Sequence, residues 1–334
     1  MSDPCLLIGD IGGTNARFAL ADADTPGFSS EQTLCCAEFE SADAAIGHFL
    51  EGVGSVSPDA ICLAAAGPVV NGGVKVTNNH WAIDAADLAA SFDTQHVQLL
   101  NDFEAIAYSI PFLARDDCIT IGLPESKDLP AGDFTVGILG PGTGLGTVGL
   151  LRRDGLLYPV VGEAGHVGFA PETQVQIDIL RALRDRFDRV SVERIVSGSG
   201  LENTYWALTQ IHGEKRPALT AEQIFDVGMS NEDPRAAEAL QMFFETLGQA
   251  AGNVALMLGA LDGIYIGGGI VRRYPQLLET SRFRSGFEGK GRHRPLLENI
   301  QTQLIMHPQP GLLGTSYFVQ QMLQATPGSA SPVL

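Results

Sequence analysis

One pattern occurs twice in this chain: an apolar run, a glycine-rich turn that carries a threonine, and a second apolar run. The first copy, GDIGGTNARFAL, lies near the N-terminus, and its strands are expected at residues 5–11 and 16–22. The second copy, FTVGILGPGTGLGTVGLL, begins at Phe134. The repeat predicts a duplicated α/β architecture. Because ligands bind beyond the carboxyl ends of strands and at domain interfaces, both turns are expected at one cleft between two domains.

Length and charge limit the class of protein. A chain of 334 residues is long enough for two domains, and no stretch approaches 18 consecutive apolar residues. A net charge of −18 disfavours nucleic acid and anionic lipid as partners. The first residues lack the pattern of a signal peptide, so a cytoplasmic protein is expected. The five cysteines have no C-x-x-C spacing, which favours structural thiols and disfavours a zinc site.

The rest of the chain alternates strand and helix signals. Between the two copies, we expect helices at Ala42–Leu50 and over AIDAADLAASF, a buried strand AICLAAAG, and a strand HVQLLND that leads into the helix FEAIAYSIPFL. The polar segment 114–133 is expected to cross between domains, and the tail ATPGSASPVL has the composition of a disordered end. Helices are also expected at 173–187, 192–197, 200–210 and 233–258, before a strand and helix joined by the GGG of IYIGGGIVRR.

The first glycine turn suits a polyphosphate with its metal ion. Gly12 and Gly13 can adopt a positive φ and let backbone N–H groups approach phosphate oxygens. Asp10, at a strand end, could hold Mg²⁺ directly or through water, and Thr14 could donate a hydrogen bond. The alternative is a bulged hairpin in which glycine serves geometry alone, and this stretch by itself leaves both open.

Two further glycine clusters have the same two interpretations. The segment GPGTGLG places Gly142, Thr143 and Gly144 between two strands, where Thr143 could contact the transferred phosphoryl group. The cluster Gly267–Gly269 lies between a strand and a helix, where an adenine or ribose could rest on bare backbone. A tight turn and close packing, respectively, are the structural alternatives, and a lone glycine cluster is weak support for a ligand.

Several polar residues lie at positions where either a catalytic or binding role or a helix-capping role is possible. Asp102 ends LLND and could be a general base, although a helix N-cap is the more common role of an aspartate there. Glu163 and His166 lie among small residues in GEAGHVGFAP, as binding residues of loops often do. Glu193 could be only an acidic residue in the first turn of a helix that Ser191 caps.

Taken together, the motifs resemble one family. GDIGGTNARFAL, LLNDFEAIA, ILGPGTGLGTVGL, GEAGHVGFAP, ERIVSGSGL and IYIGGGI occur in the order found in bacterial ATP-dependent glucokinases, and the likeness runs from about residue 5 to about residue 318. The first motif alone is shared by the wider hexokinase and actin-like superfamily. The set with LLND, GHVxFAP and ERIVSG is much narrower.

The resemblance implies a fold and an activity. The fold is the two-domain ribonuclease H-like (actin-like ATPase/hexokinase) α/β fold with an interdomain cleft. The small domain would comprise residues 1–112 and 308–334, and the large domain residues 113–307. The implied reaction transfers the γ-phosphoryl group of ATP to the 6-hydroxyl group of glucose, at the start of glycolysis. The family's habit also implies Mg²⁺ and a homodimer.

Site residues follow from the same resemblance, motif by motif. Asp102 matches the catalytic base. Residues that match sugar contacts are Asn101, Glu163, His166 and Glu193, with Asn78 of TNNHW as a neighbour of the sugar pocket. Residues that match nucleotide contacts are Gly9, Asp10, Ile11, Gly12, Gly13, Thr14, Gly142, Thr143, Gly144, Gly268 and Gly269. Asp10 is also expected to bind the metal ion.

The chain departs from the family pattern at two positions, and rival functions remain. Gly168 stands where relatives often carry Asp, and Ala164 replaces a common Gly; both flank His166. The rivals are a kinase for another hexose or an N-acetyl amino sugar, a non-catalytic sugar-sensing regulator, and an actin- or chaperone-like ATPase. The first phosphate motif begins at Gly9, which leaves no room before it for the helix-turn-helix of the repressor branch.

Overall fold

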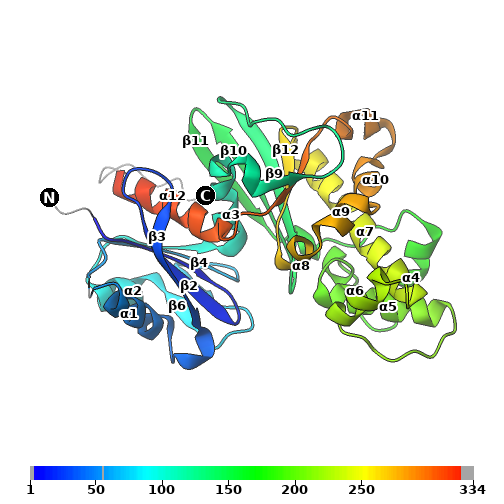
Figure 1. Ribbon diagram of the computed structural model, residues 1–334, viewed down its shortest axis with the longest axis horizontal. Helices are drawn as coiled ribbons and strands as arrows, with labels where there is room; N and C mark the ends of the chain where they lie inside the picture. The colour runs from blue at the N-terminus through cyan, green and yellow to red at the C-terminus, as the bar shows by residue number, and fades with distance from the viewer. Residues whose placement is uncertain (1–3, 55, 325–334) are drawn as a thin grey trace. The chain divides into compact units, whose positions relative to one another are not determined.

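The structure is a computed structural model that describes residues 4–54 and 56–324. The described residues form two compact units: the first holds those up to Ala114 together with those from His307 onward, and the second holds Arg115–Met306. In Figure 1 the first unit runs from blue to cyan and ends in red, and the second from green to orange. The expected disordered tail, residues 325–334, lies outside the described residues.

The first unit is built on a five-stranded sheet in the order β3-β2-β1-β4-β7. Strand β2 is antiparallel to its two neighbours β1 and β3, whereas β4 and β7 run parallel to β1. Its strands are β1 Leu6–Ile11, β2 Asn15–Ala21, β3 Phe28–Cys35, β4 Ala60–Ala65, β5 Gly73–Lys75, β6 Ala82–Asp84 and β7 Val97–Asn101. Its α-helices are α1 Ala42–Gly52, α2 Ala85–Phe92, α3 Asp102–Ser109 and α12 Pro310–Gln324.

Both faces of the β1 strand are covered, which explains its continuous apolar run. Leu7 and Ile11 are fully buried in a core that also holds Phe49 of α1. On the opposite face, Asp10 lies beside Gly311 of α12. A strand that is buried on both faces reads as unbroken hydrophobic sequence until a polar residue is needed at its end.

The second unit is built on a six-stranded sheet in the order β11-β10-β9-β12-β13-β8. Its strands are β8 Cys118–Thr120, β9 Phe134–Pro141, β10 Leu145–Arg153, β11 Leu156–Gly162, β12 Gly263–Ile266 and β13 Thr302–Ile305. Its α-helices are α4 Gln174–Arg184, α5 Gly198–Ile211, α6 Ala221–Met229, α7 Pro234–Leu258, α8 Gly269–Arg273, α9 Pro275–Thr280, α10 Phe283–Glu288 and α11 Arg294–Leu297.

The two sheets share one plan, as the repeated pattern predicts. Each has three antiparallel strands that are consecutive in the chain, followed by two strands parallel to the first of them. Each glycine turn joins the first two of the three antiparallel strands, β1 to β2 and β9 to β10. The duplicated α/β architecture is therefore confirmed, and the two turns lie at the carboxyl ends of β1 and β9.

Three expectations about local structure need correction. The segment AIDAADLAASF is not all helix: Ala82–Asp84 is the strand β6, and the Asp84 side chain then caps α2. Val192–Arg194 is a short 3₁₀ helix (η5) instead of an α-helix through residue 197. The segment 114–133 is more than a crossing, because β8 within it pairs with β13.

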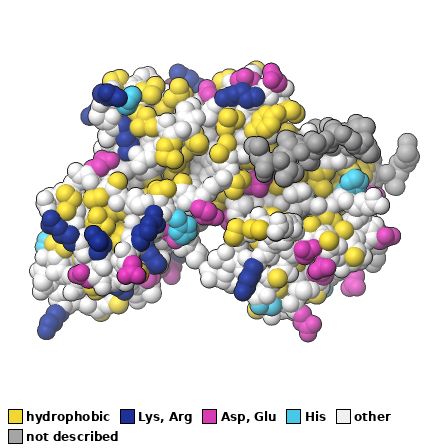
Figure 2. Space-filling view, turned by 180° about the vertical axis from the view of Figure 1, so that it is seen from behind, with side chains coloured by type: hydrophobic (Ala, Val, Ile, Leu, Met, Phe, Trp, Pro, Cys, Tyr) yellow, Lys and Arg dark blue, Asp and Glu magenta, His cyan; other side chains and the backbone are white. Residues whose placement is uncertain are grey.

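The face of the molecule drawn in Figure 2 carries both signs of charge. On the face in Figure 2, Lys and Arg side chains are interspersed with Asp and Glu side chains. Among residues 4–54 and 56–324, none of the helices has the length and apolar character that a membrane crossing requires.

Candidate active site

The first glycine turn connects β1 to β2 and lies against the loop at Thr77 and Asn78. Gly12 N–H donates to the carbonyl of Asn15 at 2.9 Å, which closes the turn. Neither Gly12 nor Gly13 has a positive φ, so that expectation is wrong. Close approach favours Gly13 instead, since a Cβ there would lie 3.1 Å from the Thr77 carbonyl oxygen.

Backbone N–H groups of this turn are available to a ligand. Within the part of the chain that the structure describes, the N–H groups of Gly13 and Thr14 have no hydrogen-bond acceptor. Thr14 is exposed. Such N–H groups suit phosphate oxygens. The neighbours Gly9 and Ile11 are core residues: a Cβ at Gly9 would meet Leu63 at 2.8 Å, and Ile11 is fully buried.

Asp10 is a carboxylate with one cationic neighbour. Its side chain is 24% exposed, and Oδ2 lies 3.9 Å from Nη1 of Arg17. Burial raises the pKa of Asp10 above its ordinary value, and the opposing effect of Arg17 is smaller. A bound cation would favour the ionised form. Among the described residues no three His, Cys, Asp or Glu side chains gather at one point, but Mg²⁺ often uses one or two carboxylates with phosphate oxygens and water. Asp10 therefore fits a magnesium ion that arrives with a nucleotide.

The junction between β7 and α3 shows whether Asp102 is the N-cap of the helix, a question that the sequence left open. Asn101 is the N-cap of α3: its Oδ1 accepts from the Phe103 N–H at 3.0 Å, and the Glu104 side chain completes a capping box. Asp102 is the first residue inside the helix, so the interpretation of Asp102 as the N-cap is wrong. Asn101 Nδ2 also donates to the carbonyl of Gly67 at 3.0 Å, so this predicted sugar ligand already has structural partners.

A hollow of about 440 Å³ opens beside the first glycine turn. It brings together three of the predicted residues, Gly13, Thr14 and Asn78, all within the first unit. The sequence analysis did not single out its other lining residues, which are Cys35, Cys36, Ala37, Asn79 and His80.

In the second unit, the predicted sugar contacts His166 and Glu193 lie together beside the second glycine turn. Glu193 Oε2 accepts from the N–H of Leu145 at 3.0 Å and lies 4.0 Å from Nε2 of His166. The His166 carbonyl accepts from Nη1 of Arg189 at 2.7 Å, which fixes the loop that carries the imidazole. Both side chains keep exposed surface, 27% for Glu193 and 59% for His166.

Close approach explains the small residues around this pair. A Cβ at Gly144 would lie 2.6 Å from Glu193 Oε2, and one at Gly165 would overlap the carbonyl oxygen of Leu145. Gly168 is one of the two positions where the chain departs from the family pattern. Nothing lies within 4 Å of a Cβ placed there, so the site has space that a side chain could fill. Glu163 is exposed and precedes the 3₁₀ turn η4, Ala164–His166.

The second glycine turn resembles the first in its available donors. Thr143 is exposed, and within the described segments the N–H groups of Thr143 and Gly144 have no acceptor. A helix was expected here from residue 200, but sequence reasoning did not single out the residues at its start. Gly198 N–H donates to the Gly142 carbonyl at 2.9 Å, and Ser197 caps the helix. The run of small residues in IVSGSGL was the available signal, because helix N-termini favour anions.

The third glycine cluster adjoins this turn from β12. Gly268 has φ of +90° and caps α8, and a Cβ there would overlap the carbonyl oxygen of Pro141. Gly269 has nothing within 4 Å of a Cβ. The first glycine is thus fixed by packing, and the second leaves bare backbone open to a ligand.

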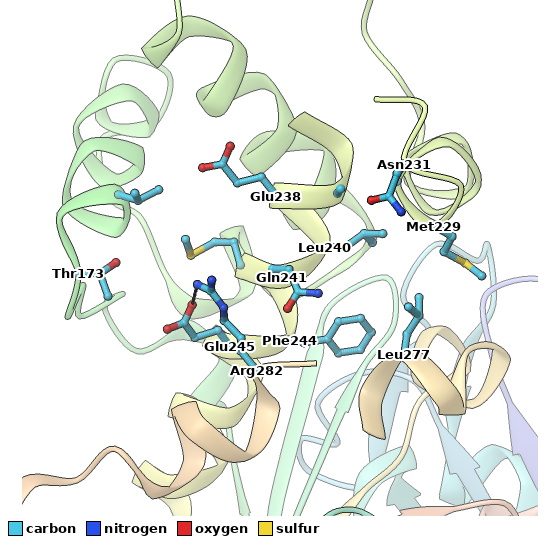
Figure 3. A pocket seen from close by; sticks show the side chains of 14 residues that line it. Thr173, Met229, Asn231, Glu238, Leu240, Gln241, Phe244, Glu245, Leu277 and Arg282 are labelled. Carbon is cyan, nitrogen blue, oxygen red and sulfur yellow. Dashed lines mark ion pairs between the residues drawn. The ribbon is translucent and has the colours of Figure 1, made fainter. Parts of the chain in front are cut away.

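A second hollow, of about 590 Å³, contains none of the predicted residues. It lies in the second unit, where Figure 3 shows Leu240 and Phe244 of α7 together with the ion pair between Arg282 and Glu245. The predicted chemistry belongs to the turns and not to this hollow.

Comparison with known proteins gives the decisive observation. A family model described as Glucokinase matches residues 7–322. The chain belongs to the glucokinase family. A glucokinase of Caulobacter sp. (strain K31) is 40% identical over 312 residues, 93% of each chain. A glucokinase structure from an Antarctic psychrotroph has a TM-score of 0.86 and 32% identity, with 96% of this chain and 100% of that one covered.

A more distant structure extends the likeness of the fold. A ROK family glucokinase from Streptomyces griseus, in complex with glucose and AMPPNP, has a TM-score of 0.64 at 18% identity over 95% of this chain and 99% of that chain. This glucokinase-family chain therefore has the actin-like ATPase fold, as expected. It is an ATP-dependent hexose kinase, and its activity is glucose phosphorylation.

Proposed function

We propose that this kinase transfers the γ-phosphoryl group of ATP to the 6-hydroxyl group of glucose, with Asp102 as the general base. The observation that carries the assignment is the division of roles at the start of α3. Asn101 caps the helix, and Asp102 Oδ1 accepts from the same Phe103 N–H at 3.0 Å, so the cap does not depend on Asp102 alone. A carboxylate in the first turn is also favoured by the helix dipole, which supports an ionised base.

The base makes a weak nucleophile stronger. Asp102 would accept the proton of the sugar hydroxyl as the bond from oxygen to phosphorus forms, while the bond from phosphorus to the leaving oxygen of ADP breaks. Such a base contributes about 10²–10⁴-fold to the rate. Alignment and charge stabilisation supply most of the remaining acceleration in phosphoryl transfer.

Sugar recognition is assigned to polar side chains of both units. Asn101, Glu163, His166 and Glu193 would bond the hydroxyl groups, with Asn78 nearby. Sites built to bond a hydroxyl reject analogues that lack it, because buried polar groups would then stay unpaired. The exposed imidazole of His166 beside the Glu193 carboxylate gives one donor and one acceptor to neighbouring hydroxyl groups.

Phosphate binding is assigned to the two glycine turns. The N–H groups of Gly13, Thr14, Thr143 and Gly144, which have no acceptor among the described residues, would bond phosphate oxygens. Asp10 would hold Mg²⁺, which neutralises phosphate charge when bound. Gly268 and Gly269 would lie against the adenosine.

The substitution Asp102→Asn tests the base. We expect kcat to fall about 10²–10⁴-fold with a melting temperature near that of the wild type, because Asn101 keeps the cap. A coupled assay of ADP formation and a thermal melt measure the two. Asp43→Asn is the matched control, since Asp43 also lies in the first turn of a helix, and it should keep full activity. Near-normal turnover by Asp102→Asn would remove Asp102 from the role of base.

Two further properties are proposed on the family resemblance alone: a homodimer and a cytoplasmic location. Light scattering coupled to size-exclusion chromatography measures the first, and cell fractionation the second. A monomer at assay concentrations would contradict the proposed dimer.

A further inference from the structure

We propose that Asn79 is a positioning residue for phosphoryl transfer: it fixes the first glycine turn so that its N–H groups face the phosphate chain. The inference rests on the proposed function of that turn. The sequence pointed to the neighbouring Asn78, which is exposed and has φ of 57°.

The contact that carries the inference is made to the Gly12 carbonyl. Asn79 Nδ2 donates to the Gly12 oxygen at 3.3 Å, and the Sγ of Cys36 lies 3.8 Å from the same oxygen. Because a trans peptide group is planar, its C=O and the next N–H point in opposite directions. Holding the Gly12 carbonyl toward Asn79 and Cys36 therefore turns the Gly13 N–H away from them.

The Asn79 amide is itself held in one orientation. Its Oδ1 accepts from the N–H of Trp81 at 3.0 Å. That N–H can only donate, so the amide oxygen must face Trp81 and the NH₂ group must face Gly12. Trp81 is 1% exposed and its indole N–H donates to the carbonyl of Phe39 at 3.2 Å, which anchors the arrangement in the core.

The first glycine turn needs contacts from other residues to fix the orientation of its peptide groups. Glycine restricts φ and ψ less than any other residue, so Gly12 and Gly13 do not fix their own peptide orientation. The nearest atom to a Cβ position at Gly12 is 3.5 Å away, so that residue itself is not tightly packed. N–H donors stabilise developing charge best when they are oriented before the reaction, and Asn79 would provide that orientation.

The isosteric substitution Asn79→Asp tests this role. The carboxylate can still accept from Trp81, but it replaces the donor to Gly12 by an oxygen that repels the carbonyl. We expect KM for ATP to rise and kcat/KM for ATP to fall about 10–100-fold, as for other groups that orient a contacting residue, with KM for glucose unchanged. Asn71→Asp makes the same change at an exposed residue of the same unit and should match the wild type.

A second variant tests whether Asn79 acts through the Gly12 carbonyl, which also lies near the Sγ of Cys36. Cys36→Ser places a hydroxyl donor beside the Gly12 oxygen and should partly restore kcat/KM for ATP in Asn79→Asp, whereas Cys36→Ala should not. If Asn79→Asp folds poorly, Asn79→Ser, which is too short to reach Gly12, replaces it and carries the same expectation.

A direct measurement of ATP affinity distinguishes a failure of this inference from a failure of the proposed function. Calorimetry with Mg–ATP should show at least about tenfold weaker binding to Asn79→Asp than to the wild type, whether or not the wild type phosphorylates glucose. Equal ATP affinity, or a lowered melting temperature with unchanged KM for ATP, would overturn the role of Asn79. Failure of the wild type to phosphorylate glucose would count against the proposed function alone.

Discussion

At the scale of single residues, Gly144 shows how the lack of a side chain positions a functional carboxylate. Glu193 Oε2 receives the Leu145 N–H and occupies the space where a Cβ of residue 144 would lie. The φ of Gly144 is not positive, so its backbone conformation does not require glycine. Its requirement comes from the approach of Glu193, which is a proposed sugar contact.

The substitution Gly144→Ala should displace Glu193 and weaken glucose binding. Bonds to charged groups contribute about 1.5–3 kcal/mol, so we expect the Kd for glucose to rise about 10–100-fold with the fold retained. Calorimetry with glucose measures the effect. Gly132→Ala, where nothing lies within 4 Å of the new Cβ, should bind glucose normally. Unchanged affinity in Gly144→Ala would show that Glu193 does not contact the sugar.

At the scale of elements, the α3 helix owes its position to α12. These helices lie side by side in the first unit (Figure 1), although α12 comes from the far end of the described chain. Gly314 of α12 allows the contact, since a Cβ there would overlap the carbonyl oxygen of Ala105. Because α3 begins with Asp102, the proposed general base, this helix contact would also position the proposed chemistry.

Gly314→Ala should therefore lower both stability and kcat. Overpacking of this kind costs about 1–3 kcal/mol, and a displaced α3 would move Asp102. Gly47→Ala in α1 is the control: nothing outside its own helix lies within 4 Å of the new Cβ, so it should stabilise by about 0.4–1 kcal/mol. Urea unfolding measures both. A Gly314→Ala variant as stable as the wild type would contradict the packing argument.

At the scale of the whole molecule, one plan is used twice, with different chemistry added to each copy. The first unit carries Asp10 and Asp102, and the second carries Glu163, His166 and Glu193. Neither unit alone holds both the proposed base and the full set of sugar contacts. The proposed function therefore needs residues of both units.

Substitutions in either unit should accordingly reduce stabilisation by glucose. Glucose at 100 times its Kd adds about 2.7 kcal/mol to the stability of a protein that binds it, and a tenfold loss of affinity removes about 1.4 kcal/mol of that. We expect Asp102→Ala and Glu193→Gln each to reduce the glucose-induced rise in melting temperature. A full rise in either variant would remove that residue from the sugar site.

Sequence by itself determined the features that local pattern encodes. The two strand–glycine–strand units are visible because alternation and glycine turns are properties of short segments. The helix α7 was expected at residues 233–258 and is Pro234–Leu258, because Asp233 caps it and Gly259 ends it in a left-handed conformation. The order of six motifs was sufficient for the family.

Tertiary structure decided what depends on distant neighbours. Strand β11 contains Pro159 and is an edge strand, and β3 is largely polar, so both are strands only because a neighbour pairs with them. Local sequence could not show that Asn79 and not Asn78 donates to the Gly12 carbonyl, nor that Asn101 Nδ2 donates to the carbonyl of Gly67. Periodicity reports how a segment folds, whereas the partner of a side chain depends on which segments the folded chain brings together.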